Sequence, residues 1–445
     1  VAVFLQNHSE MRPAGGFLGS YGDLMLTPDG VRNIRVWDIY DLDGQLDIAY
    51  VPPKELRSVT PRWGARDANW FFDFPTSAEK TLSLLEQSKI HTEKEQTFDG
   101  AIAINIHVLA SLLEIVGPIT LDDYAFAISR DNFLKEIQRE VESGEDNKAG
   151  EPKRILKKLT PVLIEKLGNL ESKEKQMLIQ KLGIHLQSKD IMLYMRDIEM
   201  ESYLKDIGVG GDVAELPEGG AADYLAVVSA NIGGGKSDAF TNQHIRLATK
   251  IDESGRISNF LTIERTHSGD KEKDWWYRAV NKSFLKIFTP LGSRLEFVKG
   301  GEAPKKSAAA TASAATAMLV DADIAAIEKT AVSIPALNAE TLVESNKSVF
   351  STWMSVPGGT TKKLEVQYMN PVKINLGPVS IPYLFVFDKQ SGANTSLDVL
   401  LEAPPGYRWA ESGGSVFNYV TASPPRRVSL PLTLIQDPLV EAPQP

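Results

Sequence analysis

Phe98-Asp-Gly-Ala-Ile-Ala-Ile104 decides the fold of the first part of the chain, together with the helix pattern that follows it. The stretch is a short apolar run of the kind that forms a buried strand. Asn105 then supplies a helix N-cap, and apolar residues recur at helical spacing as far as Val116. Gly117-Pro118 ends the pattern. The sequence therefore predicts a strand that runs directly into a helix.

The residues before this stretch predict more strands and a further helix. Val1-Ala-Val-Phe-Leu5 has the pattern of a buried strand, and Asp23–Leu26 and Val31–Tyr40 flank the turn Thr27-Pro-Asp-Gly30. A helix is expected from Ser77 to about Ser88, with Ser77 as its cap. Strands that alternate with helices in this order indicate an α/β layer with some parallel pairing.

Residues 129–205 differ from their surroundings. Amphipathic segments occur at Ser129–Ser143, Pro152–Leu167 and Ser172–Leu182, with outer faces rich in Lys and Glu. We expect a helical insertion packed on an α/β domain that spans residues 1–300.

The last third of the chain predicts an all-β domain. Lys305–Met318 is rich in Ala, Ser and Thr, so residues 301–335 are expected to form a linker or mobile loop. Short strands separated by Pro and Gly follow, without a helical period. These predict an Ig-like β-sandwich over residues 336–445 that folds independently.

Composition excludes several classes of protein. The 445 residues include no cysteine, which excludes disulfides, iron–sulfur clusters and cysteine nucleophiles. The net charge of −10 argues against binding to nucleic acid. No apolar run is long enough to cross a bilayer. Val1 is not an initiator methionine and begins a strand pattern, so we expect an upstream signal peptide or anchor that is missing here.

Five segments together resemble the bacterial "domain of unknown function 4012" family. They are Gln6–Gly22, Arg66–Pro75, Phe98–Gly100, Asp223–Lys236, and Val356–Gly359 with Tyr368. The resemblance implies an extracytoplasmic protein of the bacterial cell surface or envelope, usually anchored by an upstream membrane helix and without an established activity. The order of residue types is also similar to that of the LytR–CpsA–Psr enzymes. Those enzymes transfer polyprenyl-pyrophosphate-linked glycans, and they use Arg for the pyrophosphate and Asp for a divalent cation.

The glycine-rich loop Glu10–Gly22 and the Arg66–Pro75 stretch supply the first candidate site. Glycine lets backbone amides approach an anion closely, Arg can grip pyrophosphate, and carboxylates can hold Mg²⁺. The predicted catalytic residues are Arg12, Arg66, Asp67 and Asp73, with Asp67 and Asp73 also as metal ligands. The predicted ligand-binding residues are Glu10, Gly15, Gly16, Asn69 and Lys236. The alternative is structural, with Arg12 and Arg66 paired to Glu10 or Asp73 so that they fix two loops.

Two further patterns are weaker. Ala230-Asn-Ile-Gly-Gly-Gly-Lys-Ser237 fits a relaxed phosphate-binding loop, but a strand pattern follows it where a true site needs a helix. We therefore expect a turn whose Lys236 faces the same cleft as Arg12. Asp41, Asp43 and Asp47 are dense enough for a Ca²⁺ site, although they miss the EF-hand spacing and a solvated acidic turn explains them as well.

These observations predict an envelope protein that binds, and in one reading transfers, a phosphorylated or polyprenyl-pyrophosphate-linked glycan. Its partners would be a cell-wall or surface glycan or a lipid carrier. The alternative is a non-catalytic surface module for structure, adhesion or assembly. No two histidines lie four residues apart, and neither a His-Glu-x-x-His nor a Gly-x-Ser-x-Gly motif occurs, so the sequence leaves open whether the protein is an enzyme.

Overall fold

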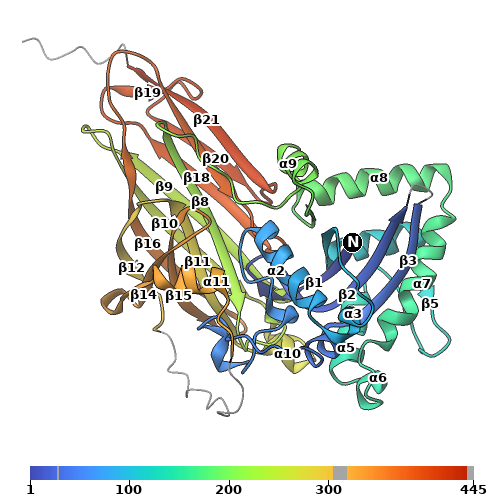
Figure 1. The fold of residues 1–445 in the computed structure, drawn as a ribbon. Coiled ribbons are helices and arrows are strands. Elements are labelled where there is room, and N and C mark those ends of the chain that lie inside the picture. Colours follow the sequence, from blue (N-terminus) through green and yellow to red (C-terminus); the bar gives the residue numbers. More distant parts are fainter. Residues whose placement is uncertain (28–29, 304–317, 438–445) are drawn as a thin grey trace, which may run out of the picture. The chain divides into compact units, whose positions relative to one another are not determined.

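The computed structural model describes residues 1–27, 30–303 and 318–437, and the chain forms two compact units (Figure 1). The N-terminal unit comprises Val1–His8, Arg12–Tyr50 and Trp63–Asp212. The C-terminal unit comprises Ser9–Met11, Val51–Arg62 and Val213–Pro445. Of the expected linker over residues 301–335, residues 304–317 lie outside the described residues. The rest of that segment was predicted wrongly, because it contains the helix α11 (Ala322–Lys329) and the strand β13 (Val332–Ile334). Within the described residues, no helix has the length and apolar character needed to span a bilayer.

The N-terminal unit is built on a five-stranded sheet with the order β3-β2-β1-β4-β7. Its strands are β1 (Ala2–Arg12), β2 (Gly15–Thr27), β3 (Gly30–Asp38), β4 (Gly100–Asn105) and β7 (Ile191–Met195). β1 and β4 are parallel, from Ala2 opposite Ala101 to Gln6 opposite Asn105. β2 with β3 and β4 with β7 are antiparallel pairs. This mixed sheet confirms the predicted α/β class with partial parallel pairing.

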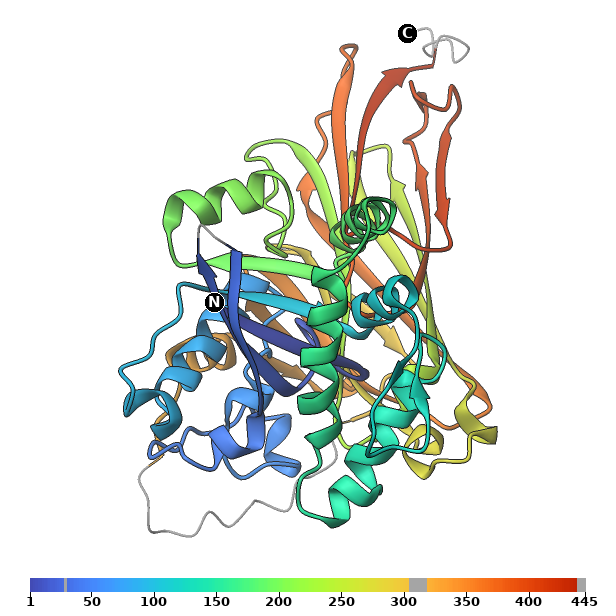
Figure 2. The ribbon, with the colours of Figure 1, turned by 90° about the vertical axis from the view of Figure 1, so that its right-hand side faces the viewer.

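Helices cover both sides of this sheet (Figure 2). They are α1 (Ile39–Asp43), α2 (Phe74–Glu86), α3 (Lys89–Thr92), α4 (Ile106–Val116), α5 (Phe133–Glu142), α6 (Glu145–Lys148), α7 (Arg154–Gly168), α8 (Ser172–Gln187) and α9 (Ile198–Asp206). The short strands β5 (Ile119–Thr120) and β6 (Ala127–Ile128) form a separate pair. The expected insertion is helical except for β7, which completes the main sheet. Its helices α5 and α7 bury Phe133, Ile155 and Leu159 in one apolar cluster with Leu113 of α4.

The start of α2 differs from the sequence prediction. The helix begins at Phe74, because the carboxylate of Asp73 accepts hydrogen bonds from the backbone N–H of Thr76 at 3.1 Å and its hydroxyl at 2.7 Å. Ser77, the expected cap, lies inside the helix. Its hydroxyl donates to the carbonyl of Phe71 instead. Asp73 thus forms the N-cap of α2.

The C-terminal unit is a sandwich of two sheets. One has six strands in the order β12-β16-β10-β9-β18-β20, and the other has eight in the order β13-β14-β15-β11-β8-β17-β21-β19. The strands are β8 (Ala221–Asn231), β9 (Thr241–Ile251), β10 (Arg256–His267), β11 (Asn281–Pro290), β12 (Arg294–Lys299), β13 (Val332–Ile334), β14 (Ala339–Glu344), β15 (Lys347–Val356), β16 (Thr360–Lys373), β17 (Ile381–Asp388), β18 (Thr395–Glu402), β19 (Tyr407–Trp409), β20 (Val416–Thr421) and β21 (Arg427–Gln436). Two helices, α10 (Trp275–Arg278) and α11 (Ala322–Lys329), connect them.

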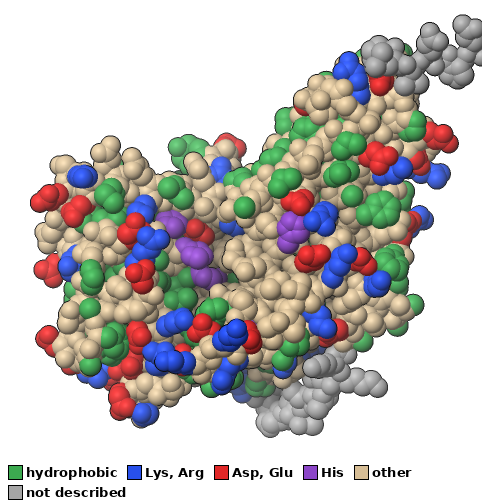
Figure 3. Space-filling model, turned by 180° about the vertical axis from the view of Figure 1, so that it is seen from behind, with side chains coloured by type: hydrophobic (Ala, Val, Ile, Leu, Met, Phe, Trp, Pro, Cys, Tyr) green, Lys and Arg blue, Asp and Glu red, His purple; other side chains and the backbone are tan. Residues whose placement is uncertain are grey.

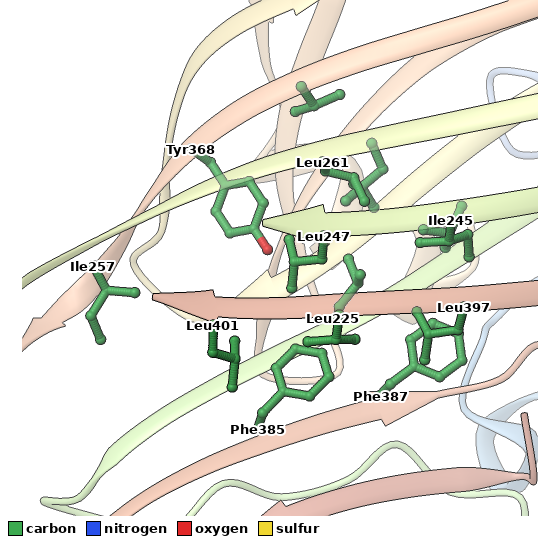
Figure 4. Close-up of a cluster of buried hydrophobic side chains, with 14 of the residues drawn as sticks. Leu225, Ile245, Leu247, Ile257, Leu261, Tyr368, Phe385, Phe387, Leu397 and Leu401 are labelled. Carbon is green, nitrogen blue, oxygen red and sulfur yellow. The ribbon is translucent and has the colours of Figure 1, made fainter. Parts of the chain in front are cut away.

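The core of the sandwich is formed by inward-facing side chains of both sheets (Figure 4). Leu225 of β8 and Phe385 of β17 come from one sheet, while Leu247 of β9 and Leu401 of β18 come from the other. All four are fully buried. The predicted β-sandwich is therefore present.

The sandwich begins earlier in the chain than predicted. Strands β8 to β12 were assigned to the α/β domain that ends near residue 300, but they pair with the C-terminal strands. β8 lies parallel to β17, and β9 lies parallel to β18. The division between the units falls after Asp212. A segment of residues 336–445 would lack the middle strands of both sheets, and we therefore do not expect it to fold alone.

Candidate functional site

The predicted site residue Arg12 lies in the interior of the N-terminal unit. Its side chain is 4% exposed, its Nε lies 3.0 Å from Oδ1 of Asp67, and its guanidinium carbon lies 5.1 Å from the centre of the Phe17 ring. Asp67 belongs to the short turn Ala65–Asp67, and its carbonyl accepts a hydrogen bond from Nε1 of Trp63. Arg12 therefore joins the end of β1 to this turn.

Arg66 lies between two carboxylates. Its Nη1 lies 2.7 Å from Oδ2 of Asp43, and its Nε lies 3.5 Å from Oδ2 of Asp67. Burial raises the pKa of Asp43, and the Arg66 charge opposes that shift. Asp43 also accepts a hydrogen bond from the backbone N–H of Ala65. Arg12 and Arg66 thus fix loops, as the structural alternative expected. That alternative named Glu10 or Asp73 as the partners, whereas these ion pairs are made with Asp67 and Asp43.

The segment Glu10–Gly22 is not the predicted loop, because β1 ends at Arg12 and β2 begins at Gly15. Gly15 and Gly16 instead allow β2 to pack closely on β1. A Cβ at Gly15 would collide with the side chain of Gln6, and one at Gly16 would collide with the backbone of Asn7. Asn69 donates from Nδ2 to the carbonyl of Gly16. These close contacts give both glycines a packing role. Asn69 has a structural hydrogen bond, although its Oδ1 is buried without a partner in the described part of the chain.

The other predicted ligands are spread over different parts of the chain. Lys236 belongs to the C-terminal unit and is 9% exposed, and its backbone N–H donates to the carbonyl of Trp276. The strand β9 follows it closely, as the sequence indicated. Glu10 lies near the end of β1, while Asp41 lies in α1 and Asp47 pairs with the exposed Lys89 at 3.0 Å. Among the described residues, no three His, Asp or Glu side chains are placed to hold a metal ion.

A second group of polar side chains lies where the parallel pairing of β1 and β4 ends, at Gln6 and Asn105. In parallel α/β sheets this edge is where ligands generally bind. The residues, which we call the edge cluster, are Gln6, His8, Asn105, His107, Ser111, His185, Lys189 and Asp190. Figure 3 shows histidine side chains gathered on one face of the molecule. Ser111 is partly exposed and His107 is exposed, whereas the other six members of the cluster are buried.

Two histidines stack at this edge. His8 follows the last parallel pair of β1 and β4, and His107 lies in the first turn of α4. Their ring centroids are 4.4 Å apart, with an angle of 21° between the planes. Burial lowers the pKa of His8 to about 3, and the neighbouring His107 adds to the shift. The Nδ1 atom of His8 is buried without a hydrogen-bond partner, so His8 is a neutral ring with an unsatisfied polar atom.

A chain of hydrogen bonds crosses the rest of the cluster. Asn105 donates from Nδ2 to Oδ1 of Asp190 at 2.6 Å. The second oxygen of Asp190 lies 2.9 Å from Nδ1 of His185. Nε2 of His185 lies 2.8 Å from Oγ of Ser111, in the middle of α4. Asn105 also caps α4 by accepting from the backbone N–H of His107.

The sequence did not predict this cluster, because its members are far apart along the chain. The histidines show no regular spacing that would indicate a shared site. One local signal was present, since Asn105-Ile-His107 places two polar side chains where a buried strand ends and a helix begins. His185 and Asp190 carried no such signal.

Comparison with known proteins gives a family for the first part of the chain. Residues 1–141 match the family "Protein of unknown function (DUF4012)", which confirms the resemblance over those residues. No curated protein matches.

Solved structures that resemble this chain do so distantly. A Legionella pneumophila protein with a provisional description as nutrient-binding is 8% identical, with a TM-score of 0.24 over 48% of this chain and 70% of that chain. An M1 zinc metallopeptidase of Deinococcus radiodurans is 12% identical, with a TM-score of 0.16 over 44% of this chain and 41% of that chain. This chain thus spans about two fifths of that peptidase.

Proposed function

Starting from the match of residues 1–141 to the DUF4012 family, we propose that this protein works in the bacterial envelope, outside the cytoplasm, and binds a phosphorylated ligand at the edge cluster. The ligand class is a phosphorylated glycan or a polyprenyl-phosphate carrier. Membrane attachment through a segment upstream of Val1 belongs to the same proposal.

The observation that carries the proposal is His8. A buried polar atom without a partner is costly, and a bound group that accepts its hydrogen bond would relieve that cost. The position supports an anion, because α4 begins next to His8 and a helix N-terminus favours negative charge. Lys189 precedes Asp190 in the chain, and its Nζ lies 4.5 Å from the centre of the Phe72 ring.

We therefore propose the edge cluster as the binding site, in place of the residues that the sequence favoured. Arg12 and Arg66 are already engaged with Asp67 and Asp43. Binding of pyrophosphate there would have to break these ion pairs, and breaking a buried pair costs several kcal/mol, about 3–5. In the edge cluster, by contrast, the Nδ1 atom of His8 has no hydrogen-bond partner among the described residues to give up.

The test is titration of the full chain with a short polyprenyl phosphate, followed by NMR of the histidine rings. We expect saturable binding and a rise in the pKa of His8, because a phosphate dianion stabilises the imidazolium form. The His8→Phe variant should lose binding. His91→Phe is the matched control, since His91 is also buried in this unit but bonds to Tyr21 away from the edge cluster. Equal binding by both variants would refute the site.

The non-catalytic assembly module is the second candidate, and the ion pairs of Arg12 and Arg66 favour it. If those residues only hold loops together, the DUF4012 segments in which they lie serve the fold. Absence of any binding of polyprenyl phosphate by the folded wild type would leave this candidate as the better one.

A further inference from the structure

Ser111, His185 and Asp190 have the connectivity of a nucleophilic relay. Asp190 meets Nδ1 of the imidazole at 2.9 Å, and Ser111 meets Nε2 at 2.8 Å. Because a carboxylate only accepts hydrogen bonds, Nδ1 must carry the proton. Nε2 then has a free lone pair and accepts from the Ser111 hydroxyl. This tautomer is the one that lets histidine act as a base toward serine.

Asn105 holds the Asp190 end of the relay in place. Asn105 donates from Nδ2 to Oδ1 of Asp190 at 2.6 Å, while Oδ2 faces His185. The backbone N–H of Asn105 also donates to the Asp190 carbonyl at 3.0 Å. Asp190 is therefore fixed at the edge of the sheet between β4 and β7. The side chains of His185 and Asp190 are 9% and 10% exposed, which shields their hydrogen bond from water.

The serine itself is within reach of solvent. Ser111 is partly exposed, and its neighbours on the same face of α4, His107 and Glu114, are exposed. These positions are separated by four and three residues, so they share one face of the helix. A substrate would have to reach Ser111 along this face, where Glu114 pairs with Lys181 of α8 at 3.0 Å.

We propose that Ser111 is the nucleophile of an acyl-transfer site that acts on carboxylic esters. Ser111 Oγ forms a bond to the ester carbonyl carbon while its proton passes to Nε2 of His185. The ester C–O bond then breaks, and the same proton passes to the departing alkoxide, which leaves as an alcohol. Water attacks the acyl-serine, and a carboxylic acid leaves as Ser111 is restored. This inference goes beyond phosphorylated-ligand binding and does not depend on it.

A second Ser–His–Asp set in the chain serves as the comparison. On the C-terminal unit, Nδ1 of His244 lies 2.7 Å from Ser396 and its Nε2 lies 3.2 Å from Asp398. The ring nitrogens are used the other way round, and Asp398 also lies 3.6 Å from Nε of Arg246. Ser396 therefore lacks the arrangement of Ser111.

The experiment uses a tagged fluorophosphonate on the full chain, with the labelled peptide located by mass spectrometry. We expect labelling at Ser111, none in Ser111→Ala, and a rate at least about a hundredfold lower in His185→Gln, since loss of a general base costs 10²–10⁴. Ser396→Ala should react at the wild-type rate.

Two outcomes would overturn the inference. One is folded wild type that is not labelled at Ser111, which would mean that the Ser111–His185 bond only fastens α4 to α8. The other is His185→Gln labelled as fast as wild type. Failure of the phosphorylated-ligand proposal would be a separate result. In that case the His8→Phe variant would bind polyprenyl phosphate as wild type does, whatever the result of the labelling experiment.

Discussion

Arg12 donates a hydrogen bond from Nε to Oδ1 of Asp67 across 3.0 Å, and neither side chain is more than 5% exposed. The two residues lie 55 positions apart, in the two segments that most clearly carry the family resemblance. Their pairing joins the end of β1 to the turn before α2. What resembled a cationic site in the sequence is thus a charged contact inside the fold.

Arg12→Ala should destabilise the N-terminal unit strongly. It leaves the Asp67 carboxylate buried without this partner, and breaking such a pair costs about 3–5 kcal/mol. The midpoint of urea unfolding measures the loss. Arg130→Ala is the control, because Arg130 pairs with Glu114 at the surface and is 57% exposed, so its loss should cost less than about 1 kcal/mol. Similar midpoints for the two variants would contradict a buried, stabilising pair.

Gly16→Ala should also destabilise this unit. Its methyl group would collide with backbone atoms of Asn7 and His8, and overpacking of this kind costs about 1–3 kcal/mol. Gly183→Ala is the matched control. Gly183 lies within α8 with open space around its Cβ position, so alanine should stabilise the helix by up to about 1 kcal/mol. Thermal unfolding of both variants checks the opposite signs.

His8 should make the N-terminal unit sensitive to acid. Burial lowers its pKa to about 3, below the ordinary 6.5, so the unfolded chain binds the proton more readily. The stability that this group contributes is complete above about pH 6.5 and is lost as the pH falls toward 3. His8→Phe should flatten this part of the curve, as measured by denaturant unfolding at a series of pH values. An unchanged slope would show that His8 does not titrate as the burial implies.

Asp223 should give the C-terminal unit the opposite pH dependence. It is fully buried between the sheets, where Asn259 donates to it at 2.7 Å, and burial raises its pKa from 3.8 to about 6. The folded state therefore binds the proton more tightly than the unfolded state. Its contribution is complete below about pH 3.8 and is lost as the pH rises through 6, by about 3 kcal/mol at most.

The Asp223→Asn variant tests this assignment, because asparagine keeps the shape and does not ionise. We expect the variant to be more stable than wild type at pH 8, and the difference to shrink toward pH 4. The unfolding transition of the C-terminal unit gives the stability to compare. If the wild type became more stable between pH 4 and 7 while the variant did not change, the assignment to Asp223 would be wrong.

The sequence alone determined the local elements of this protein. Apolar spacing and Asn105 specify α4, and the alternation of residues 242–251 specifies β9. Each depends on interactions between residues near one another in the chain, and spacing records those directly.

Only the tertiary structure decided which distant residues meet. The partner of Arg12, the pairing of β8 with β17, and the meeting of Ser111 with His185 and Asp190 all depend on sheet order and helix packing. The spacing of residues along one chain does not contain that order, because many pairings can bury the same apolar faces. The edge cluster exists because β1 and β4 lie side by side in parallel, which brings His8 of β1 next to Asn105 at the end of β4.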